Sequence, residues 1–210
     1  MRKKPMLAYP VSAKPIDYSK PTFIQPKLDG VRCVIQCDDF GGITAYSRTG
    51  KEWKNIQHIL EQLVPFFEKF PNVILDGELY NHDLRDNFEK IISLVRKTKP
   101  TDEDRSEASK LTQFHCYDII DEKLPFDQRI EFAHEAFSIV SWNSCPSIYI
   151  VDTRDIFDEK MAKAFHKVNL KEGYEGSILR TNDTYQCKRS HNLRKFKDFS
   201  DAEAYIVGYE

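Results

Sequence analysis

The segment Lys27-Leu28-Asp29-Gly30-Val31-Arg32 is the most informative part of this sequence for the fold. Strand-like segments at 23–27 and 31–36 flank it, and Gly30 permits a tight turn between them. Such a turn would hold the amine of Lys27 over a pocket. An amine is a nucleophile only when deprotonated, and burial or a nearby cation lowers its ordinary pKa of about 10.4. The stretch therefore predicts either a lysine that forms covalent intermediates or a charged turn with a solvated lysine.

The rest of the chain alternates strand-like and helix-like segments, which predicts a mixed α+β domain. Strands are expected at 43–47, 73–80, 112–120, 148–151, 176–180, 193–197 and 204–209. Helices are expected around 56–63, 86–95, 127–137 and 157–173. The last helix has an apolar stripe made of Phe157, Met161, Ala164, Phe165 and Val168. The sequence contains neither the glycine-rich turn of a dinucleotide-binding fold nor a P-loop.

Local signals refine these boundaries. Pro65 is expected to disturb the end of the first helix. Asp86 is expected to cap the second helix, with Glu89 completing a capping box three positions on. The polar segment 101–107 is expected to be a solvated loop. Residues 1–20 contain three prolines, which predicts an extended arm laid over the domain.

The composition excludes several classes of protein. The 210 residues are 40% hydrophobic, which excludes a disordered chain, and no apolar run approaches the ~20 residues of a membrane span. Five cysteines without a Cys-x-x-Cys pair indicate reduced thiols rather than disulfides or structural zinc. With 31 Lys and Arg against 33 Asp and Glu, a general polyanion binder is disfavoured. Residues 188–197 nevertheless carry five cations and no acid, which predicts a local phosphate-facing patch.

Three further segments carry residues suited to chemistry. Asp76 and Glu78 interrupt an apolar strand, which is costly unless they face a polar pocket or lie on a solvated edge strand. Glu175 opens a short apolar strand after a turn. Lys195 and Lys197 point to one face of a strand. They either face an anion such as phosphate or remain solvated surface charges.

Taken in order, these segments resemble five motifs of the covalent nucleotidyltransferases, the superfamily of ATP-dependent DNA ligases, RNA ligases and mRNA capping guanylyltransferases. The matching segments are Lys27–Arg32, Asp76–Leu79, Tyr117-Asp118, Glu175–Arg180 and Lys195–Lys197. Segments 5–8, 26–32 and 195–199 look most like small viral or bacterial ATP-dependent DNA ligases. The resemblance implies an α+β, ATP-grasp-like DNA ligase adenylation domain over residues 21–200, with antiparallel sheets flanked by helices.

The resemblance implies a role for each matched residue. Lys27 would attack the α-phosphate of ATP and form lysyl-AMP. Gln25 would read the amino edge of adenine, and Glu78 would bind the ribose. Tyr117 would stack on the base, with Phe114 as the alternative. The implied AMP site consists of Gln25, Lys27, Arg32, Glu78, Tyr117, Glu175, Lys195 and Lys197.

The remaining roles concern phosphate, metal and DNA. Arg32 would contact the ribose or a phosphate of the nucleic acid. Lys195 and Lys197 would hold the α-phosphate, stabilise its growing negative charge and depress the pKa of the nucleophilic amine. Glu175, together with Glu78, would bind Mg²⁺. Arg48 lies in segment 47–50, which resembles the part that grips the 5′-phosphate side of a nick; a plain polar hairpin turn is the alternative.

This resemblance implies that AMP passes to a 5′-phosphate at a nick in duplex DNA, during repair or replication. Three alternatives stay open: an RNA ligase, a GTP-dependent capping guanylyltransferase and a non-catalytic nucleic-acid-binding module. The protein is expected to be a monomer, cytoplasmic, without membrane contact, and inside a host cell if it is viral. DNA ligases usually continue into an OB-fold domain. Residues 201–210 are expected to begin such a domain, so slow self-adenylation and weak DNA affinity are expected of this chain.

Overall fold

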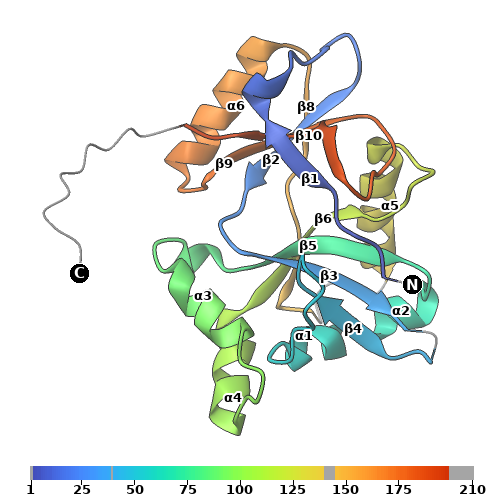
Figure 1. Cartoon of the computed structure of the whole chain (residues 1–210), viewed down its shortest axis with the longest axis vertical. Coiled ribbons are helices and arrows are strands. Elements are labelled where there is room, and N and C mark those ends of the chain that lie inside the picture. The colour runs from blue at the N-terminus through green and yellow to red at the C-terminus, as the bar shows by residue number, and fades with distance from the viewer. Residues whose placement is uncertain (1, 39, 140–144, 199–210) are drawn as a thin grey trace, which may run out of the picture.

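Two five-stranded sheets form the framework of this computed structural model, which describes residues 2–38, 40–139 and 145–198 (Figure 1). The first sheet has the order β1-β10-β9-β2-β8, from β1 (Leu7–Pro10), β2 (Thr22–Lys27), β8 (Arg154–Ile156), β9 (Gly176–Thr181) and β10 (Arg189–Phe196). The second has the order β4-β3-β5-β6-β7, from β3 (Val31–Cys37), β4 (Ile43–Tyr46), β5 (Ile74–Tyr80), β6 (Gln113–Ile119) and β7 (Ile148–Ile150). Neighbouring strands are antiparallel except β1 with β10 and β6 with β7. The predicted α+β fold with largely antiparallel sheets is confirmed.

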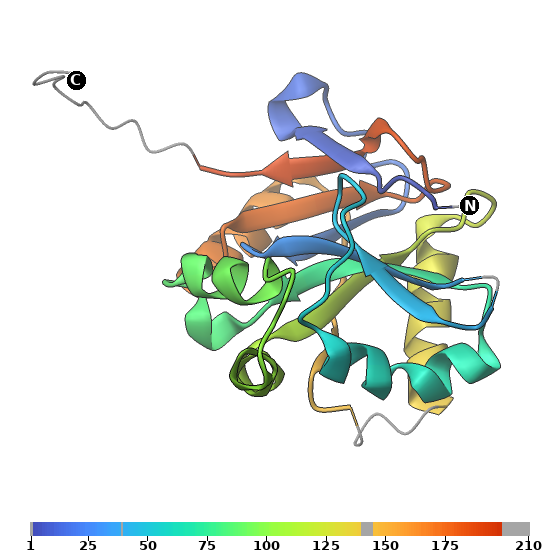
Figure 2. The same cartoon turned by 60° about the horizontal axis from the view of Figure 1, so that its bottom comes forward.

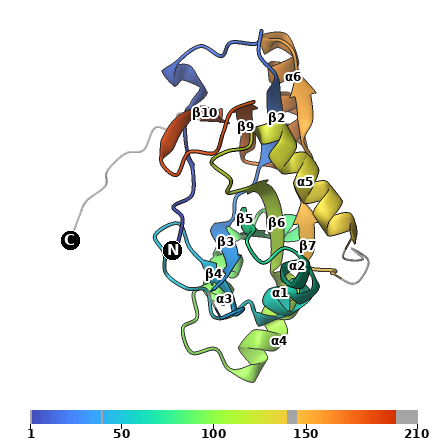
Figure 3. The same ribbon diagram turned by 90° about the vertical axis from the view of Figure 1, so that its right-hand side faces the viewer.

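Helices cover the outer faces of the two sheets. The helices are α1 (Gln57–Gln62), α2 (Val64–Lys69), α3 (Phe88–Val95), α4 (Asp102–Leu111), α5 (Phe126–Ile139) and α6 (Glu159–Lys171), with short 3-10 turns at Val11–Ala13 and His82–Leu84. Helix α6 contacts β9 and β2 of the first sheet, whereas α1 and α2 lie beneath the second (Figure 2). Helix α5 packs along β6 at the side of the molecule (Figure 3). The main hydrophobic core lies under the second sheet, where Phe66 and Phe137 stack with centroids 4.6 Å apart.

Residues 27–31 are the crossover from the first sheet to the second. Lys27 is the last residue of β2, and Val31 is the first residue of β3. A Cβ atom on Gly30 would lie 2.5 Å from the carbonyl oxygen of Leu79, a contact that real side chains do not make. Gly30 is therefore required by the close approach of β5. The crossover places the lysine between the two sheets.

Two predicted boundaries are wrong. Segment 101–107 is not a loop, because Asp102–Leu111 forms α4. Thr101 and Asp104 form a reciprocal capping box that satisfies free amides at its start, so a largely polar helix is stable there. The second helix begins after Asn87 rather than Asp86, and no side-chain hydrogen bond caps it. The expected strand 204–209 and the expected start of an OB-fold at 201–210 lie outside the described residues.

Other predictions hold in part. The first predicted helix, 56–63, corresponds to α1. Helix α2, which was not predicted, follows directly, with Pro65 in its first turn, where a missing amide hydrogen is tolerated. In the N-terminal segment, Leu7–Pro10 forms β1 alongside β10. The stripe expected on the last helix holds in part: Met161 and Phe165 pack against the core, whereas Phe157 is 72% exposed. Helix α6 also buries Ala162 and His166, which the stripe did not include. Strand β8, only three residues long, carries no alternating pattern that would have predicted it.

All five cysteines are free in the structure. No helix in the described ranges is long and apolar enough to cross a bilayer.

Candidate active site

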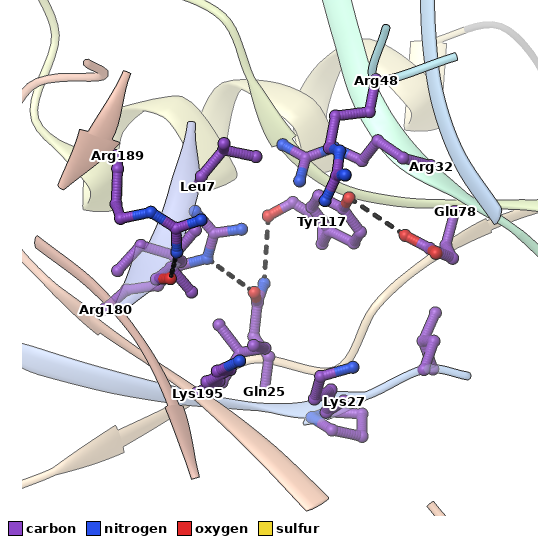
Figure 4. Close-up of a pocket in the computed structure, with 15 residues that line it drawn as sticks. Leu7, Gln25, Lys27, Arg32, Arg48, Glu78, Tyr117, Arg180, Arg189 and Lys195 are labelled. Atoms are coloured by element: carbon purple, nitrogen blue, oxygen red, sulfur yellow. Dashed lines mark hydrogen bonds between the residues drawn. The ribbon is translucent and has the colours of Figure 1, made fainter. Parts of the chain in front are cut away.

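A cavity of about 290 Å³ lies between the two sheets and receives side chains from both (Figure 4). The predicted site residues that line it are Gln25, Lys27, Arg32, Arg48, Glu78, Tyr117 and Lys195. The other polar lining residues are Arg180, to which sequence interpretation assigned no individual role, and Arg189, which belongs to the predicted patch at 188–197. The segments that resemble nucleotidyltransferase motifs therefore meet around one cavity, although they lie far apart in the chain.

Lys27 lies at the edge of this cavity and forms an ion pair with Glu175, which also pairs with Lys197. Glu175 and Lys197 do not line the cavity; they adjoin it through this contact. Burial lowers the pKa of Lys27, and the negative charges of Glu78 and Asp29 oppose that effect. Burial also lowers the pKa of Lys197, with a second contribution from the charge of Lys27. The main cause of the lowered pKa of Lys27 is therefore burial, rather than the cation pair proposed from the sequence.

The acids of β5 face the interior between the sheets. This strand is central in its sheet, so the edge-strand alternative for Asp76 and Glu78 is wrong. Burial raises the pKa of Glu78 to about 7. Its Oε2 accepts a hydrogen bond of 3.2 Å from the hydroxyl of Tyr117. Asp76, which is fully buried, accepts 2.6 Å hydrogen bonds from Arg32 Nε and the Tyr185 hydroxyl, so its charge is compensated.

Tyr117 is the aromatic side chain of the cavity. The guanidinium carbons of Arg32 and Arg180 lie 5.1 and 5.5 Å from the centre of its ring. Phe114, the alternative for base stacking, is fully buried in the main core and does not line the cavity. Of these two aromatic residues, Tyr117 is the one that a base in the cavity could contact.

The orientation of the Gln25 amide is fixed by its neighbours. Arg180 Nε can only donate, so the oxygen of the amide faces it at 2.7 Å. The Tyr117 carbonyl can only accept, so the amide nitrogen faces it at 3.1 Å. The second hydrogen of this nitrogen goes to Thr153 Oγ1 at 2.8 Å, because the hydroxyl of Thr153 donates to the Val151 carbonyl. The remaining capacity of the side chain is one acceptor lone pair on Oε1.

A buried carboxylate holds Arg180 in this position. Asp118 accepts from Arg180 Nη1 at 2.6 Å and from Arg129 Nε at 2.7 Å, and all three side chains are at most 4% exposed. The contact joins β6, β9 and α5 behind the cavity. Sequence interpretation missed both arginines, because their partner lies 11 and 62 residues away.

A basic groove continues from the cavity. Arg48 and Arg189 line both, and Arg2, Lys4 and Lys188 line the groove alone. Segment 47–50 is also a turn, closed by a hydrogen bond from the Gly50 amide to the Ser47 carbonyl. The hairpin alternative for Arg48 is thus correct for its backbone, and it does not conflict with a role for its side chain.

The described part of the chain contains no cluster of three or more His, Cys, Asp or Glu side chains that could hold a metal ion. Mg²⁺ is commonly held by one or two carboxylates together with substrate phosphates and water, so a complete protein cage is unnecessary. Glu78 and Glu175 offer such carboxylates near Lys27. This donor set fits Mg²⁺ bound together with a nucleotide.

The family model for the "ATP dependent DNA ligase domain" matches residues 5–197. The chain belongs to this family. It is 31% identical over 194 residues to the DNA ligase of African swine fever virus (isolate Pig/Kenya/KEN-50/1950), covering 89% of this chain and 44% of that protein. It is 21% identical to the DNA ligase of Enterobacteria phage T4, covering 90% of this chain and 46% of the phage protein. The chain thus spans less than half the length of these relatives.

Solved structures share the fold of this ligase domain. Chlorella virus DNA ligase-adenylate superposes with a TM-score of 0.70 at 22% identity, covering 97% of this chain and 72% of that one. The ATP complex of the bacteriophage T7 ATP-dependent DNA ligase gives a TM-score of 0.69 at 17% identity, covering 93% and 68%. The predicted family and the predicted adenylation-domain fold are confirmed.

Proposed function

We propose that this ligase domain activates 5′-phosphates at nicks in duplex DNA by way of lysyl-AMP. Lys27 Nζ forms a bond to the α-phosphorus of ATP, while the bond from that phosphorus to the pyrophosphate oxygen breaks. AMP then passes to the 5′-phosphate of a nick, and attack by the 3′-hydroxyl releases it. The observation that carries this proposal is the position of Lys27 at a cavity between the two sheets. Its side chain is half-buried, its pKa is lowered, and it shares the carboxylate of Glu175 with Lys197.

Charges around Lys27 support a reaction on a phosphate. Lys195 lines the cavity, and Lys197 shares the carboxylate of Glu175 with Lys27. Cations in these positions stabilise negative charge on a transferring phosphoryl group. Glu175 and Glu78 are the proposed ligands of Mg²⁺, which neutralises phosphate charge when bound.

The Gln25 amide supports adenosine over guanosine. A base whose edge meets Gln25 must offer a donor, because one acceptor lone pair is all that this side chain has left. The 6-amino group of adenine is such a donor, whereas guanine carries an acceptor there. This favours ATP over the GTP of a capping enzyme.

The basic groove supports a nucleic-acid partner. The surface continuous with the cavity is lined by Arg2, Lys4, Arg48, Lys188 and Arg189, of which Lys188 and Arg189 belong to the sequence patch at 188–197. Arginine and lysine contacts with phosphates supply most non-specific affinity for DNA. Nicked duplex DNA is the proposed partner because the chain belongs to a DNA ligase family. An intracellular location and a part in replication or repair belong to the same proposal.

Mass spectrometry after incubation with ATP and Mg²⁺ tests the proposal. AMP is expected on Lys27, GTP is expected to leave the protein unmodified, and Lys27→Ala is expected to abolish the adduct. Lys20→Ala, a substitution of an exposed lysine, serves as the matched control. Absence of an adduct on the wild type, or an adduct that survives Lys27→Ala, would refute the proposal. Transfer of AMP to nicked DNA but not to RNA ends separates a DNA ligase from an RNA ligase.

A further inference from the structure

A row of hydrogen-bonded polar side chains lies beside the active site, on the far side of β9 from the cavity. Its central members are buried, whereas the side chain of Asp198 at its end is 69% exposed. The row begins at Asn169 of α6, whose Nδ2 donates to Ser177 Oγ at 2.8 Å. Ser177 Oγ lies 3.1 Å from His166 Nδ1, and His166 Nε2 lies 3.1 Å from Asp198 Oδ1. Ser177 is fully buried and His166 is 3% exposed. Burying these groups is costly unless all of them are hydrogen-bonded.

The two ends of this row set the direction of every hydrogen bond in it. The Asn169 amide nitrogen can only donate, so the Ser177 oxygen accepts there and its hydrogen is available to His166 Nδ1. The carboxylate of Asp198 can only accept, so His166 Nε2 carries the hydrogen. A neutral imidazole with its hydrogen on Nε2 therefore satisfies all four side chains.

Serine, histidine and aspartate in contact also form the triad of serine hydrolases. Ser177 cannot serve as a nucleophile here, because its side chain is fully buried and does not line the active-site cavity. The cluster needs another explanation.

The cluster joins the two strand ends that carry Glu175 and Lys197. Ser177 lies two residues after Glu175, and Asp198 directly follows Lys197. The ring of His166 stacks on Phe196 of β10, with centroids 3.7 Å apart and an interplanar angle of 10°. A single side chain of α6 thus touches both β9 and β10 at the ends nearest Lys27.

We propose that His166 is a positioning residue for the transfer of AMP to Lys27. Ser177 and Phe196 are partners in the ladder of β9 and β10, and His166 ties Asp198, which lies beyond the ladder, to its end, so that Glu175 can contact Lys27 and Lys197 together. The inference rests on the proposed function. No described hydrogen bond links His166 to Gln25, Tyr117 or Arg180, so the base-binding part of the cavity is independent of it.

The test compares three substitutions of His166 in the full chain. His166→Asn keeps an acceptor at the position of Nδ1, and His166→Gln keeps a donor at the position of Nε2, whereas His166→Ala removes both contacts. Because a displacement of about 1 Å can reduce a rate by about 100-fold, kcat for lysyl-AMP formation is expected to fall 10- to 100-fold in His166→Ala. The Asn and Gln variants are expected to lose less, and KM for ATP is expected to stay at the wild-type value in all three.

His58→Ala is the matched control, because His58 is a half-buried histidine of α1 that bonds the Thr112 carbonyl at 2.9 Å, away from the cavity. It is expected to lower the melting temperature without changing kcat. Wild-type kcat in His166→Ala, or an equal loss of kcat in His58→Ala, would overturn the inference. If the variants fail to fold, a ¹⁵N spectrum of the wild-type imidazole decides. A hydrogen found on Nδ1 would contradict the hydrogen-bond directions that link Asn169, Ser177, His166 and Asp198. An inactive wild type would instead refute the proposed function.

Discussion

The fixed amide of Gln25 predicts how the domain selects its nucleotide. With both amide hydrogens and one oxygen lone pair in use, Gln25 can accept one hydrogen bond from a base and cannot donate any. Inosine triphosphate replaces the 6-amino group of adenine with a carbonyl, so two acceptors would face each other. Purine riboside triphosphate has neither group. We expect lysyl adducts to form fastest with ATP, more slowly with the purine riboside and slowest with inosine.

The structure sets the size of this effect. Leaving a buried acceptor without its partner costs about 1–3 kcal/mol, which corresponds to about 5- to 150-fold in kcat/KM. Gln25 is 1% exposed, so water can do little to compensate the missing bond, and the upper part of this range applies. The assay is single-turnover mass spectrometry of the Lys27 adduct with each triphosphate.

Two matched variants show whether Arg180 fixes the amide. Arg180 and Arg129 both donate to Asp118, but of these two only Arg180 donates to Gln25. Arg180→Lys keeps a charge for Asp118 and removes the donor that orients the amide, so the preference for ATP over inosine triphosphate should decline. Arg129→Lys should leave it intact. Equal reaction with ATP and inosine triphosphate in the wild type, or the same loss in both variants, would refute the reasoning.

Three further predictions concern stability and DNA binding. Asp118→Asn removes the charge that two buried arginines share, so the free energy of unfolding in urea should fall by about 3–5 kcal/mol; a loss below 1 kcal/mol would contradict this. Burial lowers the pKa of His115 to about 4, so the folded state binds fewer protons than the unfolded state between pH ~6.5 and ~4. Stability should therefore fall as pH drops through that window, and His115→Gln should flatten the profile. Arg48→Ala should weaken binding to nicked DNA and reduce the slope of log K against log salt by about one, a change that an exposed control such as Lys20→Ala should not produce.

Local segments of the site could be predicted, whereas the contacts that orient them could not. Lys27 and the acids of β5 lie in short sequence segments, and the residue types within each segment indicate its chemical role. The carboxylate between Arg129 and Arg180 depends on side chains from three elements, and nothing in the spacing of the sequence indicates that they meet. His166 was missed for a related reason. The buried face of its helix was predicted from apolar residues alone, and a buried histidine does not belong to such a pattern.

The errors in secondary structure have a similar origin. Helix α4 is mostly polar, so a search for apolar periodicity finds a loop there. The spacing of Thr101 and Asp104 was nevertheless a local signal for its start, because a hydroxyl and a carboxylate three residues apart can form a capping box. Asp86 and Glu89 have the same spacing but do not cap a helix, since the chain enters α3 one residue later. Capping patterns therefore indicate where a helix can begin, and packing decides which of them is used.

The placement of charge, rather than its sum, reconciles a net charge of −2 with the proposed DNA-directed function. Two acids near the cavity are matched to cations: Asp76 to Arg32, and Glu175 to Lys27 and Lys197. Glu78, which lines the cavity, accepts a hydrogen bond from Tyr117, and burial raises its pKa to about 7. Arg48 and Arg189, where the cavity meets the groove, have no ion pair among those of the described residues. Free cations at the mouth leave a positive field that reaches an approaching phosphate, while acids elsewhere limit attachment to polyanions in general. Neutralising the groove should therefore reduce association with DNA more than it reduces formation of lysyl-AMP inside the cavity.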